Sequence, residues 1–150
     1  MNRRHRARRL ALQGLCCLDA QGSRAAELVA QFIDDSKEPP PTLAAAHKLL
    51  AATTAQREES DRILARNAHH WDLSRLALVD RNILRLAVAE MRGGQTPPKV
   101  ALSEAIRLAQ EFSSAESPRF VNGVLDAVMK EILASRRSAA ELVDSSDEEE

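Results

Sequence analysis

Tyrosine is absent from this chain of 150 residues, and aromatic residues make up only 3% of it. There are also just five glycines, whereas the apolar content is 44%, much of it Ala and Leu. Strands favour aromatic and β-branched side chains, while Ala and Leu are strong helix formers, so this composition favours helix. No segment alternates apolar and polar residues with a period of two. We therefore predict an all-α protein.

Cysteine is equally scarce, since Cys16 and Cys17 are the only two and are adjacent in a predicted helix. Neighbours in a helix cannot easily form a disulfide with each other. We expect both to pack as small apolar groups in a reducing, cytoplasmic environment. No apolar run approaches the length of a membrane span, and the N-terminus lacks the apolar core of a signal peptide. We expect no contact with a membrane.

The net charge of −1 conceals a strong polarity along the chain. Residues 1–9 contain five arginines, and residues 144–150 contain five acids. The basic head and the acidic tail cancel, so their distribution says more about partners than the total does. The tail lacks apolar residues, and we predict that residues 135–150 are disordered. Most such tails only solvate, although some compete with nucleic acid for a basic surface.

The apolar periodicity predicts about six or seven helices and two hinges, near residues 36–42 and 71–75. We expect helices at 3–19, 23–35, 42–70, 72–92, 96–112 and 117–133. Gly22 and Gly93-Gly94 are predicted stops, and Pro39-Pro40-Pro41 is predicted to form a short stiff linker outside any helix.

One segment contains conflicting signals. Asn122-Gly123 is a turn signal, yet the apolar residues around it follow a helical spacing from Phe120 to Ile132. Ser117 is a good N-cap and Pro118 suits the first helical position, so we predict a helix that carries Gly123 inside it. A helical glycine costs about 0.5–1 kcal/mol relative to alanine. We expect a tight helix crossing or a ligand to offset this cost, the crossing being the simpler explanation.

No pattern supports catalysis. His69 and His70 point about 100° apart on a helix and have no ligands at a suitable spacing. The serines lie at caps and in the tail, and there is no glycine-rich phosphate loop. We expect no enzyme activity, no metal and no cofactor.

The arginine-rich head is the best candidate binding site. Arg3, Arg4, Arg6, Arg8 and Arg9 crowd two helical turns and repel one another unless an anion is near, although such a run is often only a solvated end. A second element is the predicted helix start at Ser117, which offers free N–H groups to a phosphate. Phe112, Glu116, Arg119 and Phe120 surround it, and the two phenylalanines flank one loop. Both phenylalanines could equally be core residues.

Four blocks of residues, spread over 3–133, together resemble one known family. They are Arg4 with Arg6-Ala7-Arg8, Ala11-Leu12-Gln13, Leu15 and Asp19; Val79-Asp80-Arg81 with Ile83-Leu84-Arg85-Leu86-Ala87 and Glu90; Pro98-Lys99-Val100-Ala101 with Glu104-Ala105; and Phe120-Val121-Asn122-Gly123-Val124-Leu125-Asp126. In this order and spacing they resemble the NusB family of bacterial antitermination factors.

The resemblance implies an all-α domain over residues 1–134, built as two three-helix bundles with about seven helices and joined through a long helix. It implies binding of boxA RNA from ribosomal operons, together with the ribosomal protein NusE and within the RNA polymerase antitermination complex. The implied RNA contacts are Arg4, Arg6, Arg8, Phe112, Glu116 and Phe120, and to these we add Arg3 from the arginine-rich head and Arg119 from the predicted helix start. The implied partner surface is Asp80, Arg81 and Glu90, and a homodimer is also compatible with the resemblance.

The chain departs from the family pattern at several positions. Cys16 and Ala89 stand where a tyrosine is usual, Ser103 replaces an asparagine, and Glu116 replaces an aspartate. These departures put the RNA affinity or base preference in doubt, but not the fold.

Two other interpretations of the sequence remain open. One is a NusB-like helical module that mainly mediates protein association, including self-association. The other is the RNA-binding domain of a ribosomal-RNA cytosine methyltransferase, which would need a long methyl-donor domain beyond the 150 residues seen here.

Overall fold

The computed structural model describes residues 2–68 and 72–148, and within these ranges it contains helices and no strand. The prediction of an all-α fold is confirmed. The elements are α1 (Arg3–Gln21), the 3₁₀ turn η1 (Ser23–Ala25), α2 (Ala26–Asp35), α3 (Pro40–Ala55), α4 (Arg57–Asn67), the 3₁₀ turn η2 (Leu73–Arg75), α5 (Leu78–Gly93), α6 (Pro98–Phe112) and α7 (Ser117–Glu148).

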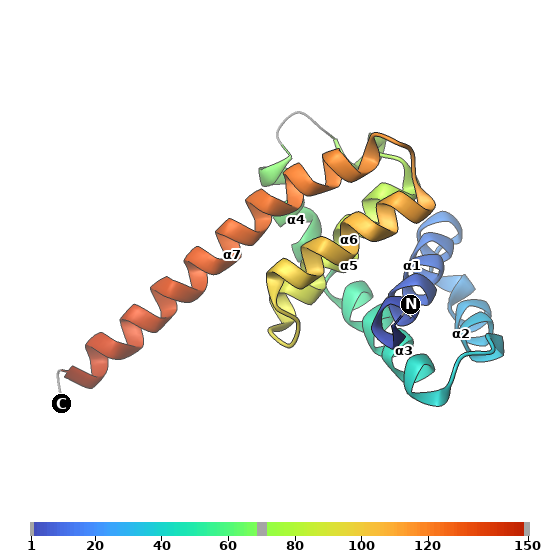
Figure 1. Ribbon diagram of the computed structural model, residues 1–150, viewed down its shortest axis with the longest axis horizontal. Helices are drawn as coiled ribbons and strands as arrows, with labels where there is room; N and C mark the ends of the chain where they lie inside the picture. The colour runs from blue at the N-terminus through green and yellow to red at the C-terminus, as the bar shows by residue number, and fades with distance from the viewer. Residues whose placement is uncertain (1, 69–71, 149–150) are drawn as a thin grey trace.

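The helices form two bundles that share α1 and α5 as their junction (Figure 1). Helices α1, α2 and α3 enclose a small core of their own, made by Ala7, Leu10, Val29, Ile33 and Ala46. Helices α5, α6 and α7 form the second bundle, and α4 packs on α5 and α7 at its side. The connection that we expected as one long helix consists of two helices, α3 and α4, which are separated by a break at Gln56.

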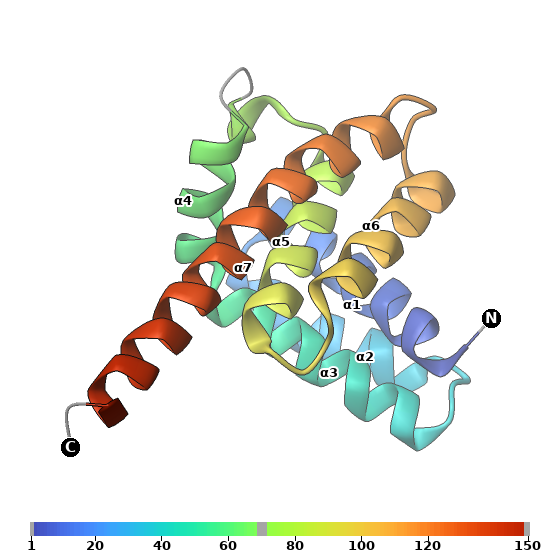
Figure 2. The ribbon, with the colours of Figure 1, turned by 60° about the vertical axis from the view of Figure 1, so that its left-hand side comes forward.

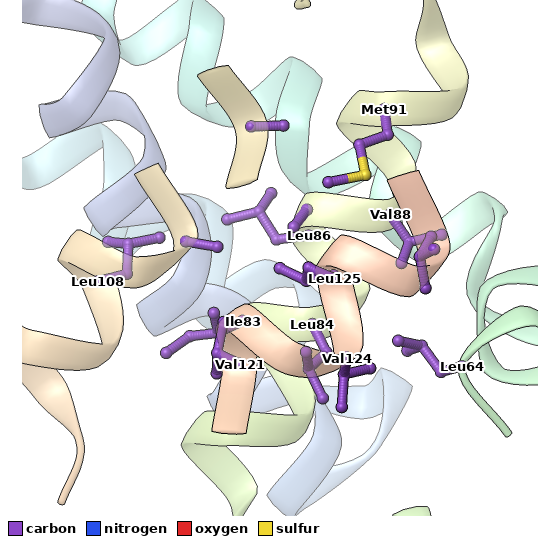
Figure 3. Packing of buried hydrophobic residues seen from close by; sticks show 14 of the residues in the cluster. Leu64, Ile83, Leu84, Leu86, Val88, Met91, Leu108, Val121, Val124 and Leu125 are labelled. Atoms are coloured by element: carbon purple, nitrogen blue, oxygen red, sulfur yellow. The ribbon is translucent and has the colours of Figure 1, made fainter. Parts of the chain in front are cut away.

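Helix α5 is enclosed on all sides (Figure 2), since α1, α3, α4, α6 and α7 all pack on it. Asp80 and every residue from Asn82 to Met91 are buried. Its apolar side chains meet those of α4, α6 and α7 in the main core, shown in Figure 3. The three- and four-residue spacing predicted a core helix correctly, but it indicated one buried stripe where the structure buries the whole circumference.

Several predicted boundaries differ from the structure. The Pro39-Pro40-Pro41 segment is not a linker, because α3 begins at Pro40 and places two prolines in its first turn. Prolines are tolerated there because the first N–H groups of a helix have no intrahelical partner. Asp72 caps only η2, whereas α5 begins later at Leu78. His69, His70 and the predicted break at Trp71 lie outside the described residues.

The predicted stops at glycine are confirmed. Gly22 ends α1 with φ +85°, and Gly94 ends α5 with φ +77° in the left-handed region. Glycine adopts these angles without the steric cost that a Cβ would bring.

Helix α7 begins at Ser117 and continues without interruption through Asn122 and Gly123. Both residues are exposed, and a Cβ built on Gly123 would meet no atom of the described chain within 4 Å. The expected tight helix crossing at Gly123 is therefore wrong. The close crossing occurs at Gly14 instead, where a Cβ would lie 2.8 Å from a methyl of Val29.

The predicted disorder from Ser135 also differs from the structure, because α7 has 32 residues and extends to Glu148. What changes near Ser135 is burial: Ile132 is buried, whereas residues 134–146 are all exposed. Lack of apolar residues removes packing, but Ala, Arg, Glu and Leu after Ala134 retain a high helix propensity. Figure 1 shows that the described part of this segment projects well away from the N-terminus.

A search of the described helices finds none that is long and apolar enough to cross a membrane.

The open space at Gly123 leads to the first prediction. Gly123→Ala should raise the free energy of unfolding by about 0.5–1 kcal/mol, because alanine loses less backbone entropy and meets no obstacle here. Urea unfolding followed by circular dichroism measures this change. Gly14→Ala is the matched control and should destabilise by about 1–3 kcal/mol through overpacking against Val29. A destabilised Gly123→Ala variant would contradict the prediction.

Candidate nucleic-acid interface

In the first turns of α1, some side chains of the arginine-rich head point to solvent and others point into the protein. Asn2 caps the helix, its side chain accepting the backbone N–H of His5 at 2.8 Å. This start leaves Arg3 and Arg4 exposed, while His5 and Arg8 are buried. No ion pair to Arg3 or Arg4 occurs within the part of the chain that the structure describes.

Arg8 is occupied inside the protein. Its Nε and Nη2 donate to the two carboxylate oxygens of Glu90 on α5 at 2.7 and 2.9 Å, and the two side chains are only 6% and 5% exposed. Burial disfavours the guanidinium charge, but the hydrogen bond and charge of Glu90 outweigh this and hold the pKa of Arg8 above its ordinary value. Arg8 and Glu90 together fasten α1 to α5, whereas the contact of Arg8 with RNA and that of Glu90 with a partner stay predictions.

His5 makes a second buried link, to α6. Its Nδ1 lies 2.7 Å from Glu104 and its Nε2 lies 2.5 Å from Glu111, and the ring is fully buried. Burial alone would raise the pKa of Glu104, but the hydrogen bond from His5 and the charges of Arg8 and Arg107 hold it below its ordinary value. No local pattern in the sequence indicates this role, since the two carboxylates lie about a hundred residues from His5.

The remaining arginines of the head are partly exposed and paired. Arg6 forms an ion pair with Glu38 at 2.8 Å, and Arg9 forms one with Glu111 at 3.1 Å. The guanidinium of Arg9 also lies over the ring of Phe112, 5.4 Å from its centroid. This cation–π contact joins the arginine head to the end of α6 and places one half-buried phenylalanine beside it.

The loop between α6 and α7 is held by Asp80 of α5. The Asp80 carboxylate accepts the hydroxyl of Ser113 at 2.6 Å and that of Ser117 at 3.0 Å. Asp80 is 9% exposed and supports this loop from inside, and the partner contact that the resemblance implied for it stays a prediction.

A hollow of about 680 Å³ opens over this loop, and we call it the α7 hollow. Its lining contains three of the four residues predicted around the start of α7, namely Glu116, Arg119 and Phe120, but not Phe112. The other lining residues are Arg75, Leu76, Ala77, Asp80, Ser114, Ala115 and Ser117. Arg75 is exposed and was not singled out from the sequence, because it is about forty residues away along the chain.

Arg81 is also used within the fold. Its guanidinium lies 2.8 Å from Asp19, whose carboxylate also accepts from Asn82 and Arg85. Burial opposes ionisation of Asp19, but the hydrogen bonds from Asn82 and Arg81 and the charges of Arg81 and Arg85 hold its pKa below the ordinary value. Arg81 therefore joins α5 to the end of α1, and its assignment to a partner surface stays a prediction.

Two other features carry less chemistry. A second hollow of about 390 Å³ lies between α1, α3 and the end of α5, with Arg4 and Lys48 in its lining. Burial raises the pKa of the Cys16 thiol to about 11, so Cys16 stays protonated and packs against the main core. Among the described residues no group of three His, Cys, Asp or Glu side chains is arranged to hold a metal ion.

The family assignment follows from comparison with known proteins. Residues 5–130 match the model of the NusB family. The chain belongs to the NusB family. It is 43% identical over 135 residues to the transcription antitermination protein NusB of Solibacter usitatus, covering 88% of this chain and 92% of that protein. It is 42% identical over 136 residues to NusB of Symbiobacterium thermophilum, covering 85% and 89%.

Solved structures of NusB proteins share the fold. A chain from a crystal structure of a plectonemic RNA supercoil superposes with a TM-score of 0.82 at 29% identity, covering 90% of this chain and 99% of the other. A chain from a complex of the antitermination factors NusB and NusE with double-stranded RNA gives 0.77 at 29% identity, covering 87% and 98%. NusB proteins are transcription antitermination factors and not enzymes.

The buried position of Arg8 leads to a prediction about stability. Arg8→Ala should lower the free energy of unfolding by about 3–5 kcal/mol, because it leaves the Glu90 carboxylate buried without its partner. Chemical denaturation measures the loss. Arg4→Ala, one turn earlier and exposed, is the control and should change stability by no more than about 0.5 kcal/mol. Equal stabilities of the two variants would contradict the structural role of Arg8.

The carboxylates of Asp19 and Glu104 predict how stability depends on pH. Both pKa values are lower in the folded protein than the ordinary values of 3.8 and 4.5. The stability they contribute is therefore fully present above the ordinary values and is lost as the pH falls through the lowered ones.

We expect melting temperatures to be steady near neutral pH and to drop below about pH 4. Asp19→Asn should melt lower than the wild type at pH 7, and this difference should shrink towards pH 3. Asp35→Asn on the exposed side of α2 is the control and should follow the wild type throughout. A gap between Asp19→Asn and wild type that stayed constant with pH would contradict the linkage.

Proposed function

We propose that this protein is an RNA-binding transcription antitermination factor that binds boxA-type RNA of ribosomal operons together with NusE. The observation that carries the proposal is a set of cations and aromatic rings, which we call the proposed surface. Its members are the exposed Arg3 and Arg4, Arg9 over Phe112, and Arg119 and Phe120 in the α7 hollow. Arginines supply phosphate contacts and aromatic rings supply stacking for unpaired bases, which is the combination that single-stranded RNA requires.

The comparisons with known proteins support the same proposal. The descriptions of two similar structures name RNA, and in one of these structures NusB is bound to NusE and double-stranded RNA. Carried to this chain, these relatives support RNA and NusE as partners. We extend the proposal to membership of the RNA polymerase antitermination complex in the cytoplasm, which is where such a factor would act.

We choose the residues that take part from the exposure and pairing of their side chains. We retain Arg3, Arg4, Phe112, Glu116, Arg119 and Phe120 as RNA contacts. Arg6 contributes through a charge that it already shares with Glu38, and Arg8 acts only by positioning α1. For NusE, we propose the beginning of α5, where Ala77 just before the helix is exposed and Leu78 and Val79 are half-buried.

A second candidate function is protein association, including a homodimer. It is favoured by two apolar side chains on α2, Leu28 and Phe32, which lie one turn apart and are 69% and 48% exposed. Single exposed apolar residues are normal, but an adjacent pair on a helix is a candidate contact surface. In this alternative the arginine head has no RNA to bind.

Salt-dependent binding separates the two functions. The double variant Arg3→Ala with Arg4→Ala should weaken binding to single-stranded boxA-type RNA and flatten the dependence of affinity on salt. Removal of one phosphate contact should change the logarithmic slope by about 0.7. Fluorescence anisotropy over a series of salt concentrations, with and without NusE, gives both quantities.

Arg24→Ala with Arg137→Ala is the matched control, since it removes the same charge from exposed positions away from this surface. Its slope should equal that of the wild type. A wild-type protein that binds no RNA, alone or with NusE, but forms dimers that Phe32→Ala abolishes would favour association instead.

A further inference from the structure

Arg75 is the one cation of the α7 hollow that neither the sequence pattern nor the family resemblance identifies. It is exposed on η2 and lines the same hollow as Glu116 of the α6–α7 loop and Arg119 and Phe120 of the first turn of α7. Within the described residues, no carboxylate lies within ion-pair distance of either Arg75 or Arg119. Two arginines that share a hollow and form no ion pair within the described chain are placed to receive an anion from outside.

The backbone that carries Arg75 is fixed by hydrogen bonds. The Asp72 carboxylate accepts the backbone N–H of Ser74 at 3.0 Å and its hydroxyl at 2.7 Å, and the N–H of Arg75 donates to the Asp72 carbonyl at 2.9 Å. These hydrogen bonds from Ser74, helped by the charge of Arg75, hold the pKa of Asp72 below its ordinary value. Arg81 reaches the carbonyl of Leu73 in the same turn, which ties η2 to α5. Arg75 is therefore presented from a defined turn.

The opposite wall is equally well defined. Asp80 holds Ser113 and Ser117, and Ser117 also lies 2.9 Å from the hydroxyl of Ser114. This arrangement fixes the loop that carries Glu116 and the first turn of α7 that carries Arg119 and Phe120. The Asp80 carboxylate is occupied by the two serine hydroxyls, so Glu116 is the acidic group of the hollow that remains available to a ligand.

The arrangement matches the parts of one nucleotide. A phosphate carries negative charge and fits between Arg75 and Arg119, while the Glu116 carboxylate repels it from the other side. A base is flat and can stack on Phe120, with an N–H of its edge donating to Glu116. The volume of about 680 Å³ is within the range of about 300–1,000 Å³ typical of small-ligand sites.

We propose that the α7 hollow holds a single unstacked nucleotide of the bound RNA, and that Arg75 grips its phosphate opposite Arg119 while its base stacks on Phe120. This inference rests on the proposed function and adds to it a second wall of the binding site, contributed by η2. It also gives the hydrogen bonds that fix η2 a role, because a phosphate site binds more tightly when both of its cations are held in position before the RNA binds.

The test compares Arg75→Ala, Arg75→Lys and Arg137→Ala in the full chain. Arg137 is an exposed arginine on the projecting part of α7, so its removal changes the net charge equally at a distant place. Binding to single-stranded boxA-type RNA is measured by anisotropy across salt concentrations, and thermal melts establish that every variant is folded.

We expect Arg75→Ala to bind about tenfold more weakly at low salt, with a logarithmic salt slope smaller by about 0.7. Arg75→Lys should restore the slope, because it keeps the charge, and only part of the affinity, because it loses the planar fork. Arg137→Ala should match the wild type. Wild-type affinity and slope in Arg75→Ala would overturn the inference while leaving the proposed function standing.

A double-mutant cycle tests whether the two side chains hold one nucleotide. If Arg75 and Phe120 hold the same nucleotide, the double variant should lose clearly less affinity than the product of the two single losses, because the first substitution already releases it. Arg75→Ala combined with Arg4→Ala should lose the full product. If the losses of affinity of Arg75→Ala and Phe120→Ala multiply fully, the inference that the two side chains hold one nucleotide is overturned.

Two further outcomes would also overturn the inference. A loss in Arg75→Ala that appears only when NusE is present would assign the hollow to a protein partner. A wild-type chain that binds no RNA in either condition would remove the proposed function and this inference together.

Discussion

A buried helix that carries charges must find a partner for each of them, and in this protein those partners tie the helix to α1, α4 and the α6–α7 loop. Helix α5 is enclosed by five other helices, yet it contains Asp80, Arg81, Arg85 and Glu90. An unpaired charge in such a place costs several kcal/mol, so a fold that leaves one unpaired is not competitive. Asp80 binds the α6–α7 loop and Glu90 binds the start of α1, while Arg81 and Arg85 share Asp19 at the end of α1 and Arg85 also binds α4. The apolar core supplies most of the stabilisation, and these pairs choose among the packings that it would tolerate.

The same pairs shape the proposed binding surface from behind. Glu90 draws Arg8 inward, and this sets the rotation of α1 that turns Arg3 and Arg4 outward. Asp80 draws two serines inward, and this sets the loop that presents Glu116 and Phe120. Arg81 reaches both Asp19 and the carbonyl of Leu73, and so connects α1 to the turn that carries Arg75. The charged residues of α5 for which the family resemblance implies a partner contact thus also support the proposed RNA surface from inside.

The sequence was sufficient for the class of fold, for the glycine stops and for the helix through Asn122 and Gly123, because these depend on local propensity and on one apolar period. It failed where two segments far apart in the chain share one interaction. The five arginines near the N-terminus looked alike in the sequence. Three of them form ion pairs, with Glu38, Glu90 and Glu111, and no local pattern could associate these distant carboxylates with them. Arg75 was missed for the same reason. The projecting end of α7 was missed for another one: low hydrophobicity correctly indicated the loss of packing after Ile132, but helix propensity does not depend on packing.

The distribution of charge also bears on why a factor of this kind would work with a second protein. Of the five arginines in residues 3–9, Arg6, Arg8 and Arg9 are already paired with carboxylates, and Arg8 is buried as well. Within residues 2–68 and 72–148, the cations of the proposed surface that have no ion pair are Arg3, Arg4, Arg75 and Arg119. With about 0.7 counterions released per phosphate on a single strand, four contacts give an affinity that falls appreciably but not steeply with salt. Phosphate contacts alone would therefore hold RNA only loosely at physiological ionic strength. The additional affinity has to come from bases held at Phe112 and Phe120, or from a partner that extends the surface. Because phosphate contacts supply only a modest part of the binding free energy, assembly depends on the right RNA and the right partner being present together.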